Sequence, residues 1–171
     1  ARFILIMAEN PCPCGYYGGP EKQCRCTASQ ILNYKKRLSR PLLDRIDIHL
    51  DVPRVKIEDL IKKPSEEDLK TTEEIRKRVK KAREMARERY QGEIFTNSEM
   101  SAKLIEKYCP LDEEKETLLK RSLKEYSLSA RSYSRILKVA RTIADLAGEE
   151  EITTADLAEA IQYRVKLEEE M

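Results

Sequence analysis

Hydrophobic residues in the first third of the chain are arranged as they are in the strands of a sheet. Residues 2–8 form a continuous apolar run, which predicts a strand buried on both faces of a parallel sheet. Residues 46–52 alternate apolar and polar side chains, which predicts a second strand with one face toward water. Between them, the Pro- and Gly-rich stretch over 11–27 predicts a loop, and the spacing over 28–38 predicts a helix. This part of the chain is therefore predicted to be α/β.

After Pro53 the apolar residues keep only the spacing of helices. Capping residues, glycines and prolines divide this part into five predicted helices. These begin at Ser65, at Asn97 or Ser98, at Asp112, at Ser129 and at Thr153, and three of them end before Gly92, Pro110 and Gly148. The first has an apolar stripe made of Ile75, Val79, Ala82 and Ala86. The sequence thus predicts an all-helical domain after a boundary between Pro53 and Pro64.

Composition limits the class of protein. Charged residues make up 37% of the 171 residues and aromatic residues 6%, which favours a solvated, largely helical protein. No apolar run reaches the roughly 18 residues that cross a bilayer. The net charge of +2 argues against a globally basic nucleic-acid binder but leaves room for local patches. Five cysteines, an odd number, favour a reducing cytoplasm and a metal site over a disulfide framework.

Four of the cysteines, Cys12, Cys14, Cys24 and Cys26, lie within 15 residues in the predicted loop, whereas Cys109 stands alone in a predicted helix. Two Cys-x-Cys pairs can place four thiolates around one ion, and four sulfur ligands suit tetrahedral zinc. Free thiols, a disulfide and an iron–sulfur cluster are the alternatives. The favoured interpretation is a structural zinc site, because four protein ligands leave no open position for catalysis.

Two polar residues stand next to the predicted strands. Asn10 follows the first strand, where ligands of open α/β sheets bind, although an Asn before Pro is most often a turn residue. Arg45 precedes the second strand. It either pairs with Asp44 or Asp47 at the surface or leaves its own subunit to stabilise charge on a neighbour's γ-phosphate. His49, within the second strand, is expected to be an exposed strand residue rather than a metal ligand.

Arg131 lies in the first turn of the helix that Ser129 is expected to cap, where the helix dipole disfavours a cation. Arg135 repeats this placement one turn later. An anion bound at this end would account for both arginines, because helix N-termini and guanidinium groups attract phosphate. Pairing with Glu125 or another nearby carboxylate is an equal alternative.

The first predicted helix of the helical domain is strongly basic in its second half. This half carries eight cations against Glu84 and Glu88; the cations are Arg76, Lys77, Arg78, Lys80, Lys81, Arg83, Arg87 and Arg89. Acidic residues dominate the start of the same helix, so its charges follow the helix dipole and favour a solvated, self-stabilised helix. The alternative is a basic strip that contacts nucleic-acid phosphates, with strongly salt-dependent binding.

Taken together, these segments resemble the C-terminal part of the magnesium-chelatase-like AAA+ ATPases of the competence protein ComM group. The matching stretches are Asn10-Pro-Cys-Pro-Cys-Gly, Cys24-Arg-Cys-Thr, Pro41-Leu-Leu-Asp-Arg-Ile-Asp, the segment from Ser129 to Leu146, and Ala160-Ile-Gln-Tyr-Arg. They are spread over nearly the whole chain and are highly specific in combination.

The resemblance implies a role for each polar residue described above. Asn10 would be the sensor-1 residue, Arg45 the arginine finger that acts on an adjacent subunit, and Arg131 the sensor-2 arginine that contacts ATP phosphate, with Arg135 beside it. The resemblance also implies a ring, expected to be a hexamer, that uses ATP and Mg²⁺. The ComM group is linked to branch migration of DNA in natural transformation, so DNA is an expected partner.

The expected architecture is α/β plus all-α. The end of a P-loop AAA+ core, with two strands, a Cys-rich loop and a helix, would occupy 1–55, and an all-helical lid would occupy 56–171. The sequence has no G-x-x-x-x-G-K-[ST] loop and no acidic Walker-B strand. We therefore expect the chain to begin within a nucleotide-binding domain and to be inactive alone as an ATPase. The alternatives are a zinc-stabilised helical module that binds nucleic acid, and a subunit of a metal chelatase.

Overall fold

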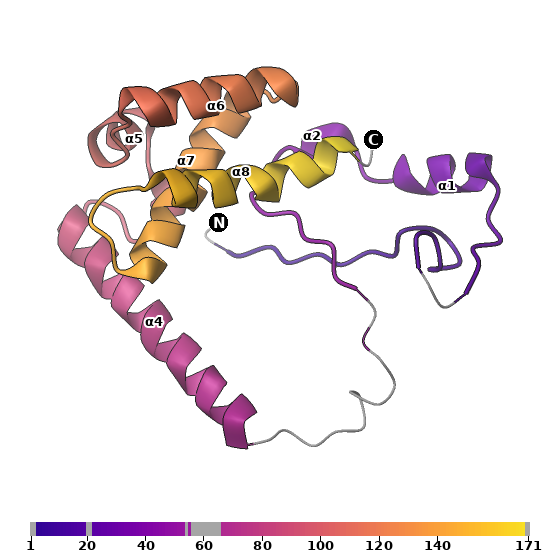
Figure 1. Ribbon diagram of the computed structural model, residues 1–171, viewed down its shortest axis with the longest axis horizontal. Coiled ribbons are helices and arrows are strands. Elements are labelled where there is room, and N and C mark those ends of the chain that lie inside the picture. Colours follow the sequence, from indigo (N-terminus) through magenta and orange to yellow (C-terminus); the bar gives the residue numbers. More distant parts are fainter. Residues whose placement is uncertain (1–2, 20–21, 54, 56–65, 170–171) are drawn as a thin grey trace. The chain divides into compact units, whose positions relative to one another are not determined.

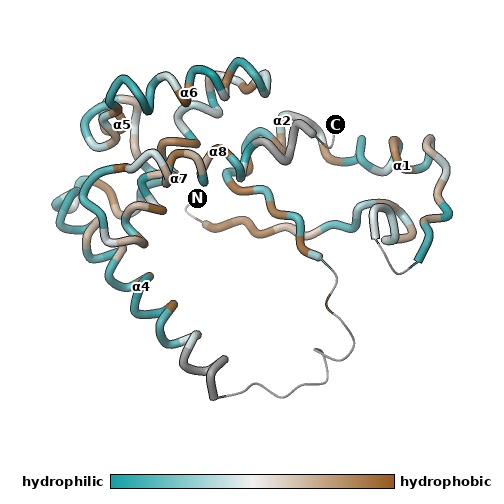
Figure 2. The backbone as a smooth tube through the Cα atoms, viewed as in Figure 1, coloured by the Kyte–Doolittle hydropathy of each residue, from teal (hydrophilic) through white to brown (hydrophobic). Residues whose placement is uncertain are grey.

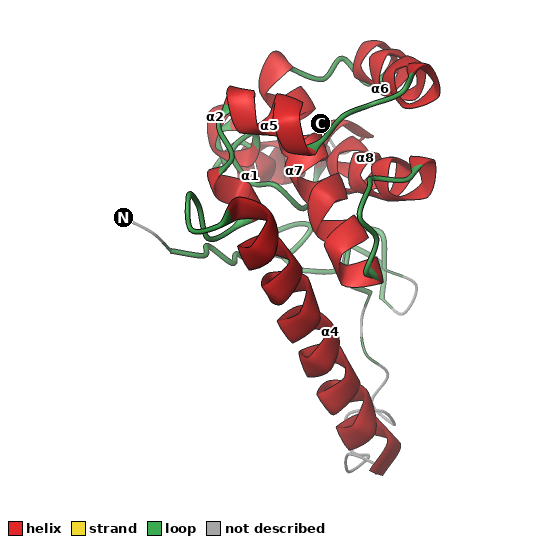
Figure 3. Ribbon diagram, turned by 90° about the vertical axis from the view of Figure 1, so that its left-hand side faces the viewer, coloured by secondary structure: helices red, strands yellow, loops and turns green. Residues whose placement is uncertain are grey.

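The computed structural model describes residues 3–19, 22–53, 55 and 66–169 (Figure 1). Within these residues all the regular secondary structure is helical (Figure 3). The chain forms two units, Ala1–Arg45 and Ile46–Met171. The predicted domain boundary lies at the start of 56–65, outside the described residues, and stays a prediction.

The first unit is mostly loop and contains two short helices. Helix α1 (Ala28–Lys35) begins at a capping box, in which the Thr27 hydroxyl accepts from the Gln30 backbone and the Gln30 side chain accepts from the Thr27 backbone. Helix α2 (Arg40–Leu43) is a single turn. The helix predicted over 28–38 is shorter than expected, because its last residues bond to carbonyls three residues back rather than four.

The predicted strands over 2–8 and 46–52 are wrong for the part of the chain that the structure describes. Both segments run as open chain there, and neither pairs with another segment as a strand. A strand forms only where its backbone groups bond to a neighbouring strand, and an apolar pattern alone does not supply that neighbour. Phe3, Ile4 and Ile6 are consequently 74%, 84% and 87% exposed, in the brown stretch that follows the N-terminus in Figure 2.

The second unit is a set of helices arranged around α7. Its elements are α4 (Glu66–Tyr90), the 3-10 helix η1 (Asn97–Glu99), α5 (Ala102–Tyr108), α6 (Glu113–Glu125), α7 (Ala130–Ala147) and α8 (Thr154–Glu169). Helix α7 contacts α4, η1, α5, α6 and α8, so it is the central element of this unit. Its buried residues Ile136, Leu137, Ala140 and Ala144 lie at the helical spacing expected from the sequence.

The start signals predicted at Asp112, Ser129 and Thr153 are confirmed. In each case the side-chain oxygen accepts the backbone N–H three residues on, at 2.9, 3.4 and 3.2 Å respectively. Helix α7 ends at Gly148, whose left-handed backbone (φ 83°) lets its N–H bond back to the last turn. The sequence was sufficient to predict these helix ends, because capping depends only on residues that are close together in the chain.

The helix predicted to start at Asn97 or Ser98 is instead two elements. Residues Asn97–Glu99 form the 3-10 turn, and α5 begins separately with Ser101 as its cap. The break comes at Met100, which leaves the helical conformation (ψ 126°) and is 3% exposed. The cap predicted at Ser65 lies outside the described residues.

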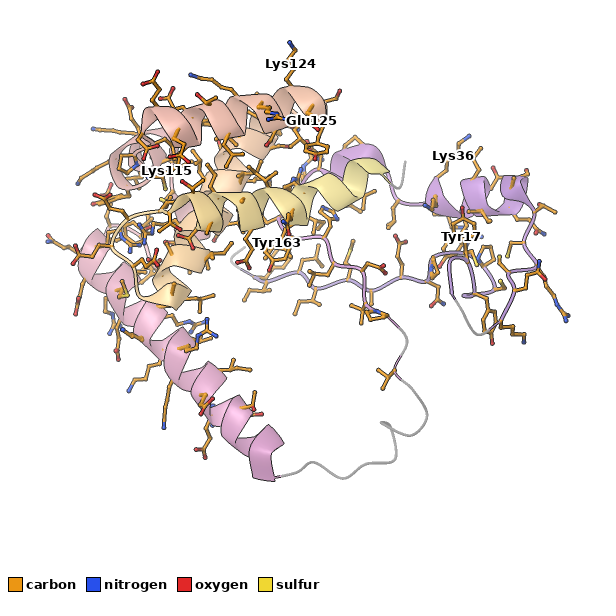
Figure 4. All side chains as sticks on the ribbon, in the orientation of Figure 1. Tyr17, Lys36, Lys115, Lys124, Glu125 and Tyr163 are labelled. Carbon is orange, nitrogen blue, oxygen red and sulfur yellow. The ribbon has the colours of Figure 1, made fainter. Side chains whose placement is uncertain are left out.

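Loops between the helices are tied to the core by side chains. The Lys115 ammonium, at the start of α6, donates to the carbonyl of Ile152 at 2.9 Å and so joins α6 to the loop before α8 (Figure 4). Cys109, at the end of α5, is 3% exposed and packs in the core, where burial raises the pKa of its thiol to about 11. Cys109 therefore acts as a small apolar residue.

The carboxylate of Asp145, near the end of α7, accepts hydrogen bonds from three different residues. Arg141 donates to it at 3.1 Å, Arg89 of α4 at 3.0 Å, and the Asn97 amide at 2.9 Å. Arg141 also donates to the carbonyls of Glu149 and Glu150. Arg141 and Asp145 are 1% and 2% exposed, so this one carboxylate joins α4, η1, α7 and the turn after α7 inside the protein.

Among the described side chains of α4, the buried ones lie in the C-terminal half of the helix. Ala82 and Ala86 are buried, whereas Ile75 and Val79, from the same predicted stripe, are 53% and 39% exposed. The N-terminal half of α4 projects away from the other helices of the unit (Figures 1 and 3). The predicted apolar stripe therefore contacts the core through its second half alone.

Replacing Asp145 by Ala should lower the free energy of unfolding by about 3–5 kcal/mol, because two guanidinium groups then lose their shared carboxylate in the interior. Urea denaturation followed by circular dichroism measures this change. The matched control is Glu116→Gln, which removes a carboxylate charge from the exposed Lys120–Glu116 pair on α6 and should leave the free energy of unfolding nearly unchanged, because water screens this pair. Equally small effects of both substitutions would contradict the central role of Asp145.

Candidate functional site

The four cysteines predicted as metal ligands lie together in the first unit. Their sulfur atoms are all within 4.8 Å of one another, and the Sγ of Cys12 lies 3.3 Å from that of Cys14 and 3.7 Å from that of Cys24. A tight turn arranges the first pair, in which the N–H of Gly15 donates to the carbonyl of Cys12 at 2.9 Å. The Gly15 backbone is left-handed (φ 76°), a conformation that favours glycine.

All four sulfurs are free thiols, so the arrangement could bind a metal ion. Hydrogen bonds from the backbone of Arg25 and Tyr16 lower the pKa of Cys14 to about 6, so one thiolate is present near neutral pH. Desolvation, by contrast, raises the pKa of Cys26 to about 12. Because a bound cation stabilises thiolates, it would favour ionisation of the remaining thiols as well. Four sulfur donors at these separations suit a soft, tetrahedral ion such as Zn²⁺.

Asn10, the predicted sensor residue, stands beside this cluster. It is exposed and, with Ala8, Glu9 and Tyr34, lines an open hollow of about 290 Å³. Its side-chain carbon lies 3.7 Å from the point that a Cβ on Gly15 would occupy, so it covers the glycine turn of the cysteine cluster. The amide of Asn10 is therefore positioned by the same turn that gathers the cysteines.

Arg45 is exposed and ends the first unit. Its Nη1 donates to the carbonyl of Pro41 in the preceding turn at 2.7 Å. Of the two carboxylates suggested as its surface partners, Asp44 and Asp47, Asp47 forms an ion pair with Arg135 of α7.

Arg131 lies in the first turn of α7, as predicted, and its side chain is exposed. Among the described residues it has no hydrogen-bond or ion-pair partner. The carboxylate suggested by the sequence as its partner, Glu125, lies 3.6 Å from Nε of Arg121 instead (Figure 4 labels Glu125). Arg135, one turn later, contacts Asp47 rather than standing open beside Arg131.

The segment over 46–49 is held onto α7 and α8 by polar contacts. Besides the Asp47–Arg135 pair, the N–H of His49 donates to the carbonyl of Tyr163 on α8 at 3.1 Å (Figure 4). His49 is partly buried there, not an exposed strand residue as predicted. The helices thus provide the hydrogen-bond partners that the predicted sheet would have supplied.

Arg164 completes this arrangement and was missed from the sequence. It is 1% exposed, and its guanidinium donates to the carbonyl of Ile46 and, at 3.2 Å, to the Ser132 hydroxyl. A signal was available, because Arg164 continues the apolar stripe of α8 in phase with Leu157 and Ile161. A lone cation at a core position of a helix indicates a buried, hydrogen-bonded guanidinium.

The basic half of α4 is largely open to solvent. Seven of its eight cations are exposed; these are Arg76, Lys77, Arg78, Lys80, Lys81, Arg83 and Arg87. Arg89 differs, because it turns inward to Asp145. The spacing of Arg76, Lys80, Arg83 and Arg87 places these four on one face of the helix.

Two family models match the chain. The one described as magnesium chelatase, subunit ChlI C-terminal, matches residues 69–164, and the one described as magnesium chelatase, subunit ChlI, matches residues 1–60. The chain belongs to the magnesium chelatase ChlI family. This confirms the resemblance inferred from the sequence motifs.

The chain is also similar to individual proteins over nearly its whole length. Competence protein ComM of Haemophilus influenzae is 42% identical over 164 residues, which are 96% of this chain and 31% of that protein. Proteins described as uncharacterized protein YifB, from Salmonella typhimurium and Escherichia coli, are each 39% identical over the same shares. The chain therefore spans less than a third of the length of these relatives. None of the helices in the described residues is long and apolar enough to span a membrane.

In the metal-free protein, an alkylating agent at a pH of about 7.5 should modify Cys14 first and leave Cys109 unmodified. The reason is that Cys14, with a pKa of about 6, is then mainly thiolate, whereas Cys109, with a pKa of about 11, is thiol. Adding Zn²⁺ should protect Cys12, Cys14, Cys24 and Cys26 together. Mass spectrometry of the alkylated peptides measures the order of labelling. Unchanged labelling of these four after Zn²⁺ addition would contradict the metal site.

Proposed function

We propose that this chain is the part of a ring-forming AAA+ ATPase that senses and completes the nucleotide site. In this assignment Asn10 is sensor 1, Arg45 is an arginine finger that acts on the neighbouring subunit, and Arg131 is sensor 2. ATP and Mg²⁺ would be bound by the full-length protein, because the chain has no phosphate-binding loop of its own and spans less than a third of its relatives.

The observation that carries this proposal is that Arg131 lies at the start of α7 without a compensating carboxylate among the described residues. A cation in the first turn of a helix is unfavourable, and among the described residues no carboxylate compensates it. The backbone N–H groups at this end and the guanidinium both attract phosphate oxygens. A bound nucleotide would therefore supply the anion that this end of α7 lacks.

Arg45 supports the same function from the other unit. Its side chain is exposed at the end of the first unit, so the guanidinium is open to solvent, from which another subunit could approach. An arginine that reaches a γ-phosphate stabilises the charge that develops in phosphoryl transfer. Asn10, at the edge of an open hollow, has an amide that can orient a phosphate or a water.

Zinc is proposed as the resident metal of the four-cysteine cluster. Cys12, Cys14, Cys24 and Cys26 would hold it, and it would supply structural cross-linking rather than catalysis. Its position fits this role, because the loop has no regular structure of its own and one of its turns supports Asn10.

DNA is proposed as the partner on which the full-length protein acts. The exposed cations of α4 support this assignment, because such a strip attracts nucleic-acid phosphates, and one relative is a competence protein, ComM of Haemophilus influenzae. Four of these cations share one face and are themselves exposed, so a phosphate backbone could approach them without displacing packed side chains.

Replacing Arg45 by Ala in the full-length protein should lower kcat for ATP hydrolysis on the order of 10³-fold and leave ATP affinity unchanged, because the finger acts on the neighbour's transition state. Steady-state ATPase assays and nucleotide titration measure the two quantities. Arg37→Ala is the matched control, since Arg37 is an exposed arginine of the same unit, beside the Tyr34 ring. Equal losses of turnover and of binding would contradict action in trans.

Replacing Arg76, Arg83 and Arg87 by Gln should weaken DNA binding and reduce the slope of log K against log salt by up to about 0.9 for each lost phosphate contact. Fluorescence anisotropy over a range of salt concentrations measures the slope. The control removes the same charge from Lys120, Arg121 and Lys124, which are exposed on α6. Equal effects of the two triple variants would show that only net charge matters and would contradict a DNA contact on α4.

A further inference from the structure

One buried guanidinium connects two segments that are far apart in the sequence. Arg164 of α8 donates to the Ser132 hydroxyl in the first turn of α7 and to the carbonyl of Ile46. Ser132 directly follows Arg131, and Ile46 directly follows Arg45. Arg164 therefore contacts the residue that follows Arg131 and the residue that follows Arg45, the two arginines proposed to bind phosphate.

Two further contacts fix the same segment. Asp47 pairs with Arg135 of α7, and the N–H of His49 donates to the carbonyl of Tyr163 on α8. We call residues 46–49, with these partners and Arg164, the latch. The latch holds the backbone immediately after Arg45 against the helix that carries Arg131.

The contacts of the latch differ in how firmly they hold. Arg164 is 1% exposed and Ser132 is equally buried, so a guanidinium released from its acceptors there would remain desolvated. The Asp47–Arg135 pair is half open to water, with side chains 48% and 26% exposed, so it can exchange at little free-energy change. The contact at Ile46 is therefore the firmer of the two, and Ile46 is the residue that follows Arg45 in the sequence.

We infer that Arg164 is a positioning residue, which links phosphate binding at Arg131 to the placement of Arg45 through the latch. This inference rests on the proposed function. When phosphate binds at Arg131 and shifts the first turn of α7, Ser132 and Arg164 move with this turn, and the carbonyl of Ile46 moves with Arg164. The subunit that has bound nucleotide thereby presents its finger to the neighbour, through one connected set of hydrogen bonds.

The test uses the full-length protein and two substitutions in the latch. Asp47→Asn removes the ion pair with Arg135 at a half-exposed position, and Ser132→Ala removes one acceptor of Arg164. The control is Glu116→Gln, which makes the same carboxylate-to-amide change on α6. For each protein, kcat, ATP affinity, thermal midpoint and hydrogen exchange of peptides covering 46–49 are measured.

The expected result is a fall in kcat on the order of tenfold, because a displaced catalytic group reacts slowly, with ATP affinity as in the unaltered protein. The thermal midpoint should be unchanged in Asp47→Asn, whose ion pair is half exposed, and lower in Ser132→Ala, which removes an acceptor from the buried Arg164. Exchange at 46–49 should be faster in both latch variants and unchanged in the control. Adding Asp47→Asn to Arg45→Ala should cause no further loss of turnover, because the latch acts through Arg45.

Three results would overturn the inference. The first is faster exchange at 46–49 with an unchanged kcat, which would leave the proposed ATPase intact and remove the coupling role. The second is a further loss of turnover in the Arg45→Ala, Asp47→Asn double variant, which would assign the latch a role apart from the finger. The third, absence of ATP hydrolysis in the unaltered full-length protein, would overturn the proposed function and the inference together.

Discussion

The helical unit depends on the placement of one buried carboxylate, that of Asp145. A carboxylate taken out of water is stable only if it is closely paired, and here two arginines and an amide surround it. Because these donors come from α4, η1 and α7, an arrangement of the three elements that separated any of them from Asp145 would leave a buried polar group without its partner. Apolar packing gathers these helices, and the carboxylate favours the arrangement in which all its donors meet.

The two buried arginines of the unit act alike at opposite ends of α7. Arg141 donates to backbone carbonyls of the turn after α7, and Arg164 donates to the backbone carbonyl of Ile46 near the start of α7. In both cases a guanidinium satisfies loop carbonyls that no regular element would pair. Non-helical backbone is therefore held in place near both ends of α7, in the turn after the helix and around Ile46. This is why a segment with the sequence pattern of a strand can be held by helices.

Features of the fold could be predicted from the sequence when they depend on contacts between residues that are close together in the chain. The caps at Asp112, Ser129 and Thr153 could be predicted, because each is a contact between residues three apart. The closeness of the four cysteines followed from their spacing within one loop. The strands could not be predicted reliably, because a strand forms only when it pairs with a second strand, and the apolar pattern does not identify that partner. Arg141 and Arg164 were missed because charged residues were taken to lie at the surface, and their partners are distant in sequence.

The exposed run that begins at Phe3 has a consequence for the behaviour of this chain in solution. From Phe3 to Ala8 it contains no charge, no proline and no glycine, and large apolar side chains dominate it. Short uncharged segments of this kind, left open to solvent, are the usual nuclei of intermolecular β-aggregation. These six residues are therefore expected to lower the colloidal stability of the isolated polypeptide. The well-packed helices around α7 can remain folded while the preparation precipitates.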